Sequence, residues 1–437
     1  MRILGPIEST FNAVRLSTSA NSRSIDRGAM SADDFLRVAL LAIAAAATLT
    51  ISLRDPRAVW MVECASFLTA ALAIRRVDRL PLLLCAPLAA IALWGFAQLA
   101  LGATEDRFAT LEAALRMASL AAIAITAAAV FGTPRGIELL AVWLARFGFV
   151  IATAGVLVYF TSPGKLLWIF PSPYPDSWGV FLSRNNFAQF LELALPAALY
   201  AASRTPEEPQ HASRPQNANF EIAGAAVMLA AGIASASRAG SIILIVECAV
   251  CLSLLRRSRK RWRWKFGSAA ALCVAIAGSS QLIGRFRQPD PLELRREMAR
   301  SALAMIRDRP LAGFGLGSFA AVYPAYATFD IGATVDHAHN DWLEWTAEGG
   351  VGFAAAWMVL AARLIVPAIR TVWGIGVLAV FAHAAVDFPF ARMGIAAWVF
   401  LLIGAMASPG EEKTGSRESR LLDAPWDTRS NFPVTRR

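Results

Sequence analysis

The sequence predicts an all-α polytopic membrane protein, and its composition and its apolar runs together set that class. Of 437 residues, 56% are hydrophobic and only 17% are charged, whereas soluble proteins carry about 25% charged residues. The apolar residues gather in runs that approach the roughly 20 residues a helix needs to cross the hydrocarbon core. The net charge of +10 falls in short basic clusters between these runs. This pattern is typical of membrane topology and argues against nucleic-acid binding.

About twelve apolar runs are candidate membrane helices. They lie near residues 35–53, 58–74, 80–101, 114–131, 137–160, 186–202, 220–237, 239–255, 266–283, 349–368, 372–388 and 391–407. The seventh and eighth runs are separated only by the short polar segment around Arg238, so they could also form one long run.

The polar segments divide the chain into five parts. Residues 1–34 and 408–437 form two tails, residues 35–283 hold the first nine candidate helices, residues 284–348 form a large loop, and residues 349–407 hold the last three helices. Lys and Arg stay on the cytoplasmic side of membrane proteins. The densest basic run, 256–265, therefore predicts that both tails are cytoplasmic and that the large loop lies outside.

The five cysteines all lie within apolar runs. Cys248 and Cys251 have the spacing of a metal or redox motif, but no second pair and no nearby histidine accompanies them. Zinc and redox sites need accessible thiolates. We therefore expect buried, unpaired cysteines and no disulfide framework.

Three arginines from distant parts of the chain are predicted to meet His339 at the outer face: Arg184, Arg238 and Arg295. An arginine beside apolar helix is costly and is a functional candidate. Arg238 could instead extend toward the membrane surface. Arg184 could belong to an ordinary helix start in which the following asparagines, Asn185 and Asn186, act as caps, although such a start also favours anions.

Two further features belong to the large loop. Residues 291–309 mix apolar side chains with arginines, which predicts an amphipathic helix on the membrane surface whose arginines bind a lipid headgroup or a lipid-linked phosphate. Residues 313–318, Gly-Phe-Gly-Leu-Gly-Ser, resemble a phosphate loop, but they follow no strand. A tight turn is therefore the prediction.

His337 and His339 lie in the segment Asp336-His-Ala-His-Asn-Asp341. With a neighbouring aspartate they could chelate a metal. Alternatively, one imidazole accepts a proton or contacts substrate near neutral pH, or both are structural. Glu344 and Glu348 follow at helical spacing, and they could line the same cavity or cap it.

The segment from His339 to Gly350, His-Asn-Asp-Trp-Leu-Glu-Trp-Thr-Ala-Glu-Gly-Gly, resembles the His-Asn-x-x-Leu…Glu-x-Gly signature of the O-antigen ligase and polymerase superfamily. Three further similarities are Ser237-Arg-Ala-Gly240, Asn185-Asn-Phe187 before a helix, and Arg295 upstream of Pro310-Leu-Ala-Gly-Phe-Gly315. Together they span residues 180 to 360. One departure is Met298-Ala299, where relatives commonly place a tryptophan after the arginine.

The resemblance implies a glycosyltransferase of the GT-C type in the bacterial inner membrane, with the large periplasmic loop between helices 9 and 10. Such an enzyme transfers a glycan from undecaprenyl diphosphate to an acceptor hydroxyl at the periplasmic face, without a metal or another cofactor. The acceptor is another glycan or the lipid A core of lipopolysaccharide, and the surrounding lipids are further partners. The shared motifs do not separate ligases from polymerases.

Carried onto this chain, the resemblance makes His339 and Arg238 the catalytic residues and lets Arg238 and Arg295 engage the diphosphate. The substrate-binding residues that we predict are Arg295, Arg184, His337, Asn340 and Glu348.

The alternative function is a transporter or flippase for a lipid-linked sugar. It draws on Glu63, Glu192 and Glu247, which lie inside apolar runs, because charged residues at mid-membrane depth mark transport pathways. The ionisable residues gather instead near one rim, which favours the enzyme.

Overall fold

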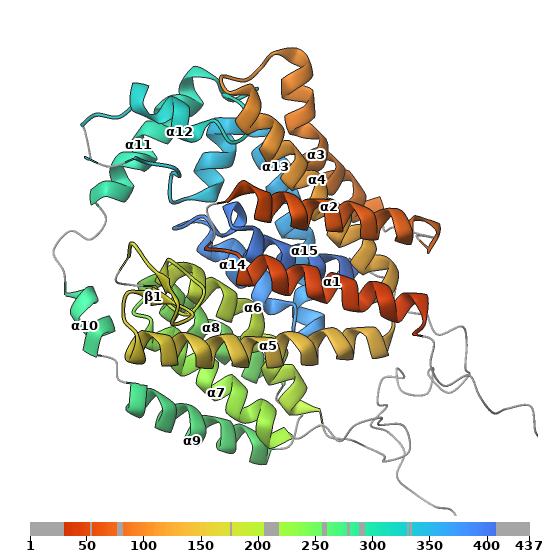
Figure 1. The fold of residues 1–437 in the computed structure, drawn as a ribbon, viewed down its shortest axis with the longest axis vertical. Coiled ribbons are helices and arrows are strands. Elements are labelled where there is room, and N and C mark those ends of the chain that lie inside the picture. Colours follow the sequence, from red (N-terminus) through yellow and green to blue (C-terminus); the bar gives the residue numbers. More distant parts are fainter. Residues whose placement is uncertain are drawn as a thin grey trace, which may run out of the picture.

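The structure is a computed structural model that describes residues 30–52, 55–76, 82–174, 177–204, 218–255, 260–277, 280–287, 293–329, 332 and 334–407. Most of the two predicted tails, 1–34 and 408–437, and the first half of the basic run 256–265 lie outside the described residues. The described part is nearly all helix, which confirms the all-α prediction (Figure 1).

Each predicted apolar run contains a helix. The helices of the bundle are α1 (Ala32–Leu49), α2 (Pro56–Ala73), α3 (Leu82–Leu101), α4 (Arg107–Val130), α5 (Pro134–Thr161), α6 (Arg184–Ser203), α7 (Ala218–Ala234), α8 (Arg238–Leu254), α9 (Lys260–Ala277), α13 (Asp341–Thr371), α14 (Ile375–His383) and α15 (Met393–Ala407). The apolar stretch around Arg238 is two helices, because α7 ends at Ala234 and the Ser237 side chain caps α8 by accepting from Gly240 N.

Four of the described helices are long and apolar enough to cross a membrane: Leu84–Leu101, Arg107–Val130, Pro134–Thr161 and Asp341–Thr371. Two shorter apolar helices are Asn219–Ala234 and Met393–Ala407. The predicted span 372–388 contains only the nine residues of α14. At 1.5 Å per residue this helix is about 14 Å long, which is too short to cross about 30 Å of hydrocarbon.

The two most deeply buried helices are α6 and α15. Every residue of α15 from Met393 to Ala405 is buried, and α6 is buried from Asn186 to Leu199. Helices that are apolar on all sides belong in an interior. Accordingly, α6 packs against α5, α7, α8 and α14, whereas α15 packs against α1 and α4.

The large loop carries three short helices, α10 (Ser280–Phe286), α11 (Glu293–Asp308) and α12 (Phe319–Val322), followed by the 3₁₀ turn η2 (Tyr323–Ala325). They lie along one side of the molecule, as does the hairpin of β1 (Lys165–Leu166) and β2 (Phe170–Pro171) from the loop between α5 and α6 (Figure 1). A second 3₁₀ turn, η3 (Pro389–Ala391), joins α14 to α15.

The amphipathic helix predicted at 291–309 is present as α11, but protein covers its apolar side. Met298, Ala302 and Met305 are buried in a small core that belongs to the loop itself. Leu294 and Leu303 stay exposed. The membrane-surface position was therefore wrong for the face that carries Met298, because the loop supplies its own apolar partners.

The glycine-rich segment 313–318 is a tight turn docked on α13, as predicted. Phe314 N donates to Ala347 O at 3.0 Å, and Gly315 N donates to Glu348 O at 2.9 Å. Gly313 has φ +67°, and a Cβ there would lie 2.2 Å from Glu348 O. The glycines therefore serve a close backbone approach.

Helix α13 is interrupted at Gly350, where φ is 74° and ψ is 177°. A Cβ at this position would lie 2.1 Å from the carbonyl oxygen of Leu311. The side chain of Gln98 on α3 ties the same region together, because its Nε2 donates to Ala312 O at 2.7 Å and to Glu348 O at 2.8 Å. These contacts fix the loop against α13, which begins two residues after His339.

Candidate active site

His339 lies immediately before α13, and the backbone places its ring. The Asn340 side chain caps α13 by accepting from Leu343 N at 3.1 Å. The φ of His339 is +51°, a left-handed conformation that is uncommon for a non-glycine residue and clusters at functional sites. Its Nδ1 lies 3.1 Å from Asp387 Oδ1, and its side chain is 35% exposed.

Asp387 lies in the turn between α14 and α15 and is held from several sides. Its Oδ2 accepts from Asn185 Nδ2 at 2.5 Å, and its Oδ1 accepts from Phe388 N at 3.0 Å. Asn185 Oδ1 in turn accepts from Ser237 Oγ at 2.8 Å. One hydrogen-bonded chain therefore runs from the start of α8 through the start of α6 to His339.

The carboxylate of Asp387 is ionised although it is buried. Burial raises its pKa, but the hydrogen bond with His339 and the electrostatic interactions with His339, His383 and Arg295 outweigh burial and lower the pKa to about 2. A carboxylate that accepts from Nδ1–H holds the imidazole in one tautomer and orientation. Nε2 is then the ring nitrogen that can take a proton.

Four half-buried arginines lie near this pair: Arg184, Arg238, Arg285 and Arg295. Arg238 Nη1 donates to Arg285 O at 3.4 Å. Burial and the charges of Arg285 and Arg238 lower the pKa of Arg184. Burial and the charges of Arg285 and Arg295 lower the pKa of Arg238. The charge of Arg295 also lowers the pKa of Asp387. The structure thus brings together the three arginines singled out from the sequence, near His339.

The other predicted site residues divide into two groups. His337 lies beside the site, because its ring stacks on Phe388 with centroids 4.4 Å apart, while its Nδ1 lies 2.8 Å from Glu344 Oε1. Asn340 serves as the helix cap, and Glu348 is buried with Oε1 accepting from Phe319 N at 2.8 Å. Asn340 and Glu348 therefore hold the backbone that presents His339.

Within the described residues, no group of three or more His, Cys, Asp or Glu side chains is arranged to hold a metal ion. His337 and His339 contact different carboxylates, Glu344 and Asp387. The five cysteines are unpaired. Cys248 and Cys251 are buried, as expected from the sequence, but the expectation of burial was wrong for the exposed Cys64 and the half-buried Cys85 and Cys273.

Two members of the site were missed in the sequence. Asp387 fell inside the predicted helix 372–388 and was not singled out, although it is a lone acid in a strongly apolar region; Arg285 was not singled out either. The role considered for Asn185 and Asn186 was also wrong. Ser183 caps α6 instead, by accepting from Asn185 N at 3.2 Å, so the Asn185 amide is available to Asp387.

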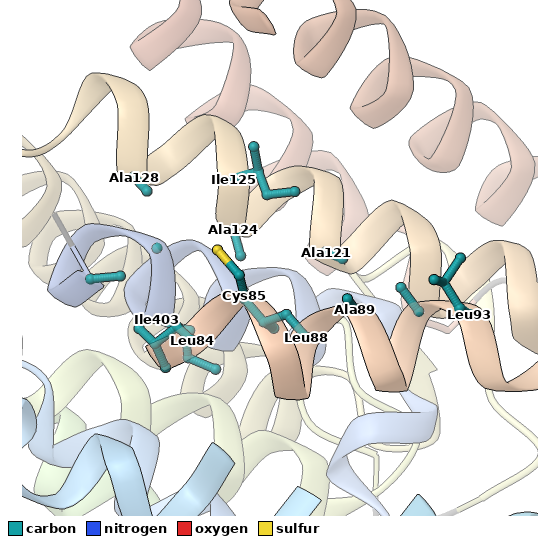
Figure 2. A pocket seen from close by; sticks show the side chains of 13 residues that line it. Leu84, Cys85, Leu88, Ala89, Leu93, Ala121, Ala124, Ile125, Ala128 and Ile403 are labelled. Atoms are coloured by element: carbon teal, nitrogen blue, oxygen red, sulfur yellow. The ribbon is translucent and has the colours of Figure 1, made fainter. Parts of the chain in front are cut away.

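A cavity of about 270 Å³ lies elsewhere, between α3, α4 and α15. Figure 2 shows its wall, made of apolar side chains together with the Cys85 thiol. None of the site residues lines it. An apolar wall without a charged or hydrogen-bonding group cannot stabilise a diphosphate, so this cavity is not the candidate active site.

Residues 223–358 match the family model described as O-antigen ligase. The matched segment runs from α7 into α13 and includes Arg238, Arg295 and His339. Arg184 and Asp387 lie outside it. No curated protein matches the chain.

Proposed function

We propose that the chain, whose residues 223–358 match the O-antigen ligase family model, transfers a glycan from undecaprenyl diphosphate to an acceptor hydroxyl. The single observation that best supports this proposal is the contact of His339 with a buried aspartate that also interacts with Arg295, one of a group of neighbouring arginines. One titratable group and several fixed cations are what transfer from a diphosphate leaving group requires.

In the proposed reaction the acceptor oxygen attacks the anomeric carbon of the donor glycan. The new glycosidic bond forms while the bond from the anomeric carbon to the diphosphate oxygen breaks, and the diphosphate leaves with the bonding electrons. His339 Nε2 takes the hydroxyl proton, and the carboxylate of Asp387 stabilises the imidazolium that forms.

The arginines act on the leaving group. Negative charge grows on the diphosphate as its bond to the sugar breaks, and guanidinium groups fixed in a half-buried site stabilise that charge. Arg also meets phosphate oxygens with two parallel hydrogen bonds. We assign Arg238 and Arg295 to the diphosphate, with Arg184 and Arg285 completing the cluster, and His337 to the sugar side of the site.

The proposal places this chemistry at the periplasmic face of the bacterial inner membrane. Its support is the distribution of basic residues: the dense cluster at 256–265 is retained on the cytoplasmic side, opposite the loop that carries His339. Ligases and polymerases differ in the acceptor, which is lipid A core for one and a lipid-linked glycan for the other. The family match does not favour the transporter alternative.

The test is a transfer assay with purified protein in phosphatidylcholine nanodiscs. Undecaprenyl-diphosphate-linked oligosaccharide is the donor, and lipid A core and a second lipid-linked glycan are offered as acceptors. We expect His339→Ala to reduce transfer to background, because the hydroxyl proton loses its acceptor. The control is Arg370→Gln, an exposed position at the opposite end of α13, which should transfer at the wild-type rate.

Normal amounts of His339→Ala protein in the membrane and an unchanged melting midpoint would exclude misfolding. Transfer by that variant at the wild-type rate would refute the assignment. The acceptor that supports turnover separates the ligase from the polymerase.

A further inference from the structure

A fifth arginine, Arg392, contacts the same aromatic ring, that of Phe388, as the catalytic histidine. It stands in the turn before α15, and its Cζ lies 4.9 Å from the centre of the Phe388 ring. The same ring contacts His337 at 4.4 Å and His339 at 4.7 Å between centroids. Phe388 therefore has both histidines and one guanidinium as neighbours.

Arg392 and Arg116 on α4 leave buried donors unused. Within the described part of the chain, the Nε atoms of both arginines are buried and have no hydrogen-bond partner. Burial has the largest effect on the pKa of Arg392 and lowers it. The charged or titratable groups with the largest effects on that pKa are Asp387, Arg116, Asp336 and Tyr174. Arg116 is the second cation among them, and its helix, α4, packs along α15, which begins directly after Arg392.

Asp387 and Asp336 offset part of the charge of Arg392, and Arg116 interacts with Glu63 and Glu348. The two buried Nε–H donors nevertheless remain without an acceptor among the described residues, which is costly unless a ligand supplies one. An unsatisfied buried donor destabilises a fold, and the cost is larger when the donor is charged. Like charges held close together add repulsion. Two guanidinium groups with free, buried N–H donors are complementary to an anion. Its oxygens would accept from the donors, and its charge would neutralise the repulsion.

The pair is separate from the arginines assigned to the donor. Those arginines lie on α6, α8, α10 and α11 and act on one another. None of them is among the groups with the largest electrostatic effects on the pKa of Arg392. Asp387 is the shared neighbour, since it interacts with Arg295 and with Arg392. Positive charge therefore flanks the contact between His339 and Asp387 on two sides.

We propose that Arg116 and Arg392 form a second anion site, which binds a phosphate or carboxylate group carried by the acceptor glycan. The attacking hydroxyl must come within about 3 Å of the histidine nitrogen. An anionic group held next to Phe388 would anchor the acceptor at this side of His339, while the other arginines hold the donor diphosphate. The identity of the ligand as an acceptor rests on the proposed function, whereas the binding of an anion does not.

The first test is therefore a binding stoichiometry that needs no turnover. The wild-type protein in phosphatidylcholine nanodiscs, which offer no anionic headgroup, is titrated with inorganic pyrophosphate by calorimetry. We expect two equivalents to bind. Arg392→Gln should bind one, Arg295→Gln should bind one, the double variant should bind none, and the exposed control Arg370→Gln should bind two.

A single equivalent on the wild-type protein, or two on Arg392→Gln, would overturn the second site. If Arg392→Gln does not fold, Arg392→Lys decides in its place. This variant keeps the charge but loses the planar fork, so the weaker of the two affinities should fall about tenfold while the stoichiometry stays at two. No change in either affinity would contradict the proposal.

The second test identifies the ligand as the acceptor. With a phosphorylated acceptor, Arg392→Gln should raise the acceptor KM about 10- to 100-fold, the usual consequence of losing a hydrogen bond to a charged group. The donor KM should stay the same, and so should the KM for the same acceptor after phosphatase treatment. Equal effects on both acceptor forms would refute the acceptor assignment.

The two proposals fail in different ways. If the protein transfers no glycan at all but pyrophosphate stoichiometry still falls from two to one in Arg392→Gln, the proposed function is wrong and the anion site stands. If transfer proceeds and one equivalent of pyrophosphate binds to the wild type and to the variants alike, the second anion site is wrong and the proposed function stands.

Discussion

The substitution Asp387→Asn tests whether the buried carboxylate, rather than the fold around it, makes His339 an effective base. Asparagine keeps the size of the side chain and one oxygen, so Phe388 N keeps a possible partner. It removes the negative charge and replaces one acceptor oxygen with a donor. The contacts with Asn185 Nδ2 and His339 Nδ1 can then no longer both be satisfied.

The magnitude for stability follows from the pKa of Asp387, which is about 2 in the fold and 3.8 for the free group. At roughly 1.4 kcal/mol for each pKa unit, the ionised form stabilises the folded state by about 2 kcal/mol. The side chain is only 2% exposed, so solvent screening takes little from this figure. We therefore expect Asp387→Asn to lower the free energy of unfolding by about 2 kcal/mol at pH 7.

The pH dependence has a definite sign. A carboxyl group whose pKa is lower in the folded state stabilises that state at pH values above its unfolded pKa, and the contribution is lost as the pH falls through its folded pKa. The difference in unfolding free energy between wild type and Asp387→Asn should hold above pH 4 and disappear between pH 4 and pH 2. Denaturant unfolding in mixed micelles across this range measures it.

For catalysis, a mispositioned imidazole or a wrong tautomer removes most of the benefit of a general base, which contributes about 10²- to 10⁴-fold. We expect kcat for glycan transfer to fall by that factor in Asp387→Asn, and Asp387→Glu to recover part of it. A variant that loses the expected stability but transfers glycan within threefold of wild type would refute the role given to this carboxylate.

Two further predictions concern parts of the fold that support the site. Gly350→Ala should lower the melting midpoint and reduce transfer, because a Cβ there meets a backbone oxygen at 2.1 Å in a left-handed conformation; Gly267→Ala, where nothing lies within 4 Å, is the matched control and should not destabilise. Glu192→Gln should cost about 1–3 kcal/mol in denaturant unfolding, because it leaves the fully buried His383, whose Nδ1 lies 2.7 Å from Glu192 Oε1, without its carboxylate partner. An unchanged midpoint for Gly350→Ala, or a Glu192→Gln protein as stable as wild type, would contradict these readings.

The helices could be predicted because one variable, the length of an apolar run, decides them. The break at Arg238 was harder, since the flanking runs are apolar on both sides. A serine side chain that caps the second helix resolves it. The extent of α14 was not predictable, because its end depends on partners distant in sequence. His383 contacts Glu192 on α6, and Asp341 N donates to Ala384 O and Asp387 O.

The amphipathic pattern of α11 shows the same limit in another form. Apolar spacing predicts that one face is hidden, but it does not say whether lipid or protein hides it. Here Phe319, Tyr323 and other residues of the same loop supply the cover. Likewise the glycine spacing at 313–318 is compatible with a phosphate loop and with a tight turn, and the carbonyl oxygen of Glu348 next to Gly313 decides for the turn.

The candidate histidine could be singled out from the sequence, but its partner could not. His339 stands in a polar motif next to a helix start, so local sequence identifies it. Asp387 is recruited from 48 residues away, and its position depends on an asparagine at the start of α6 and a serine at the start of α8. Each of these residues has an ordinary local explanation as a cap or a turn. Their chemistry appears only when the four helix ends meet, and for that reason a lone acid inside an apolar region is the feature to examine first in such a sequence.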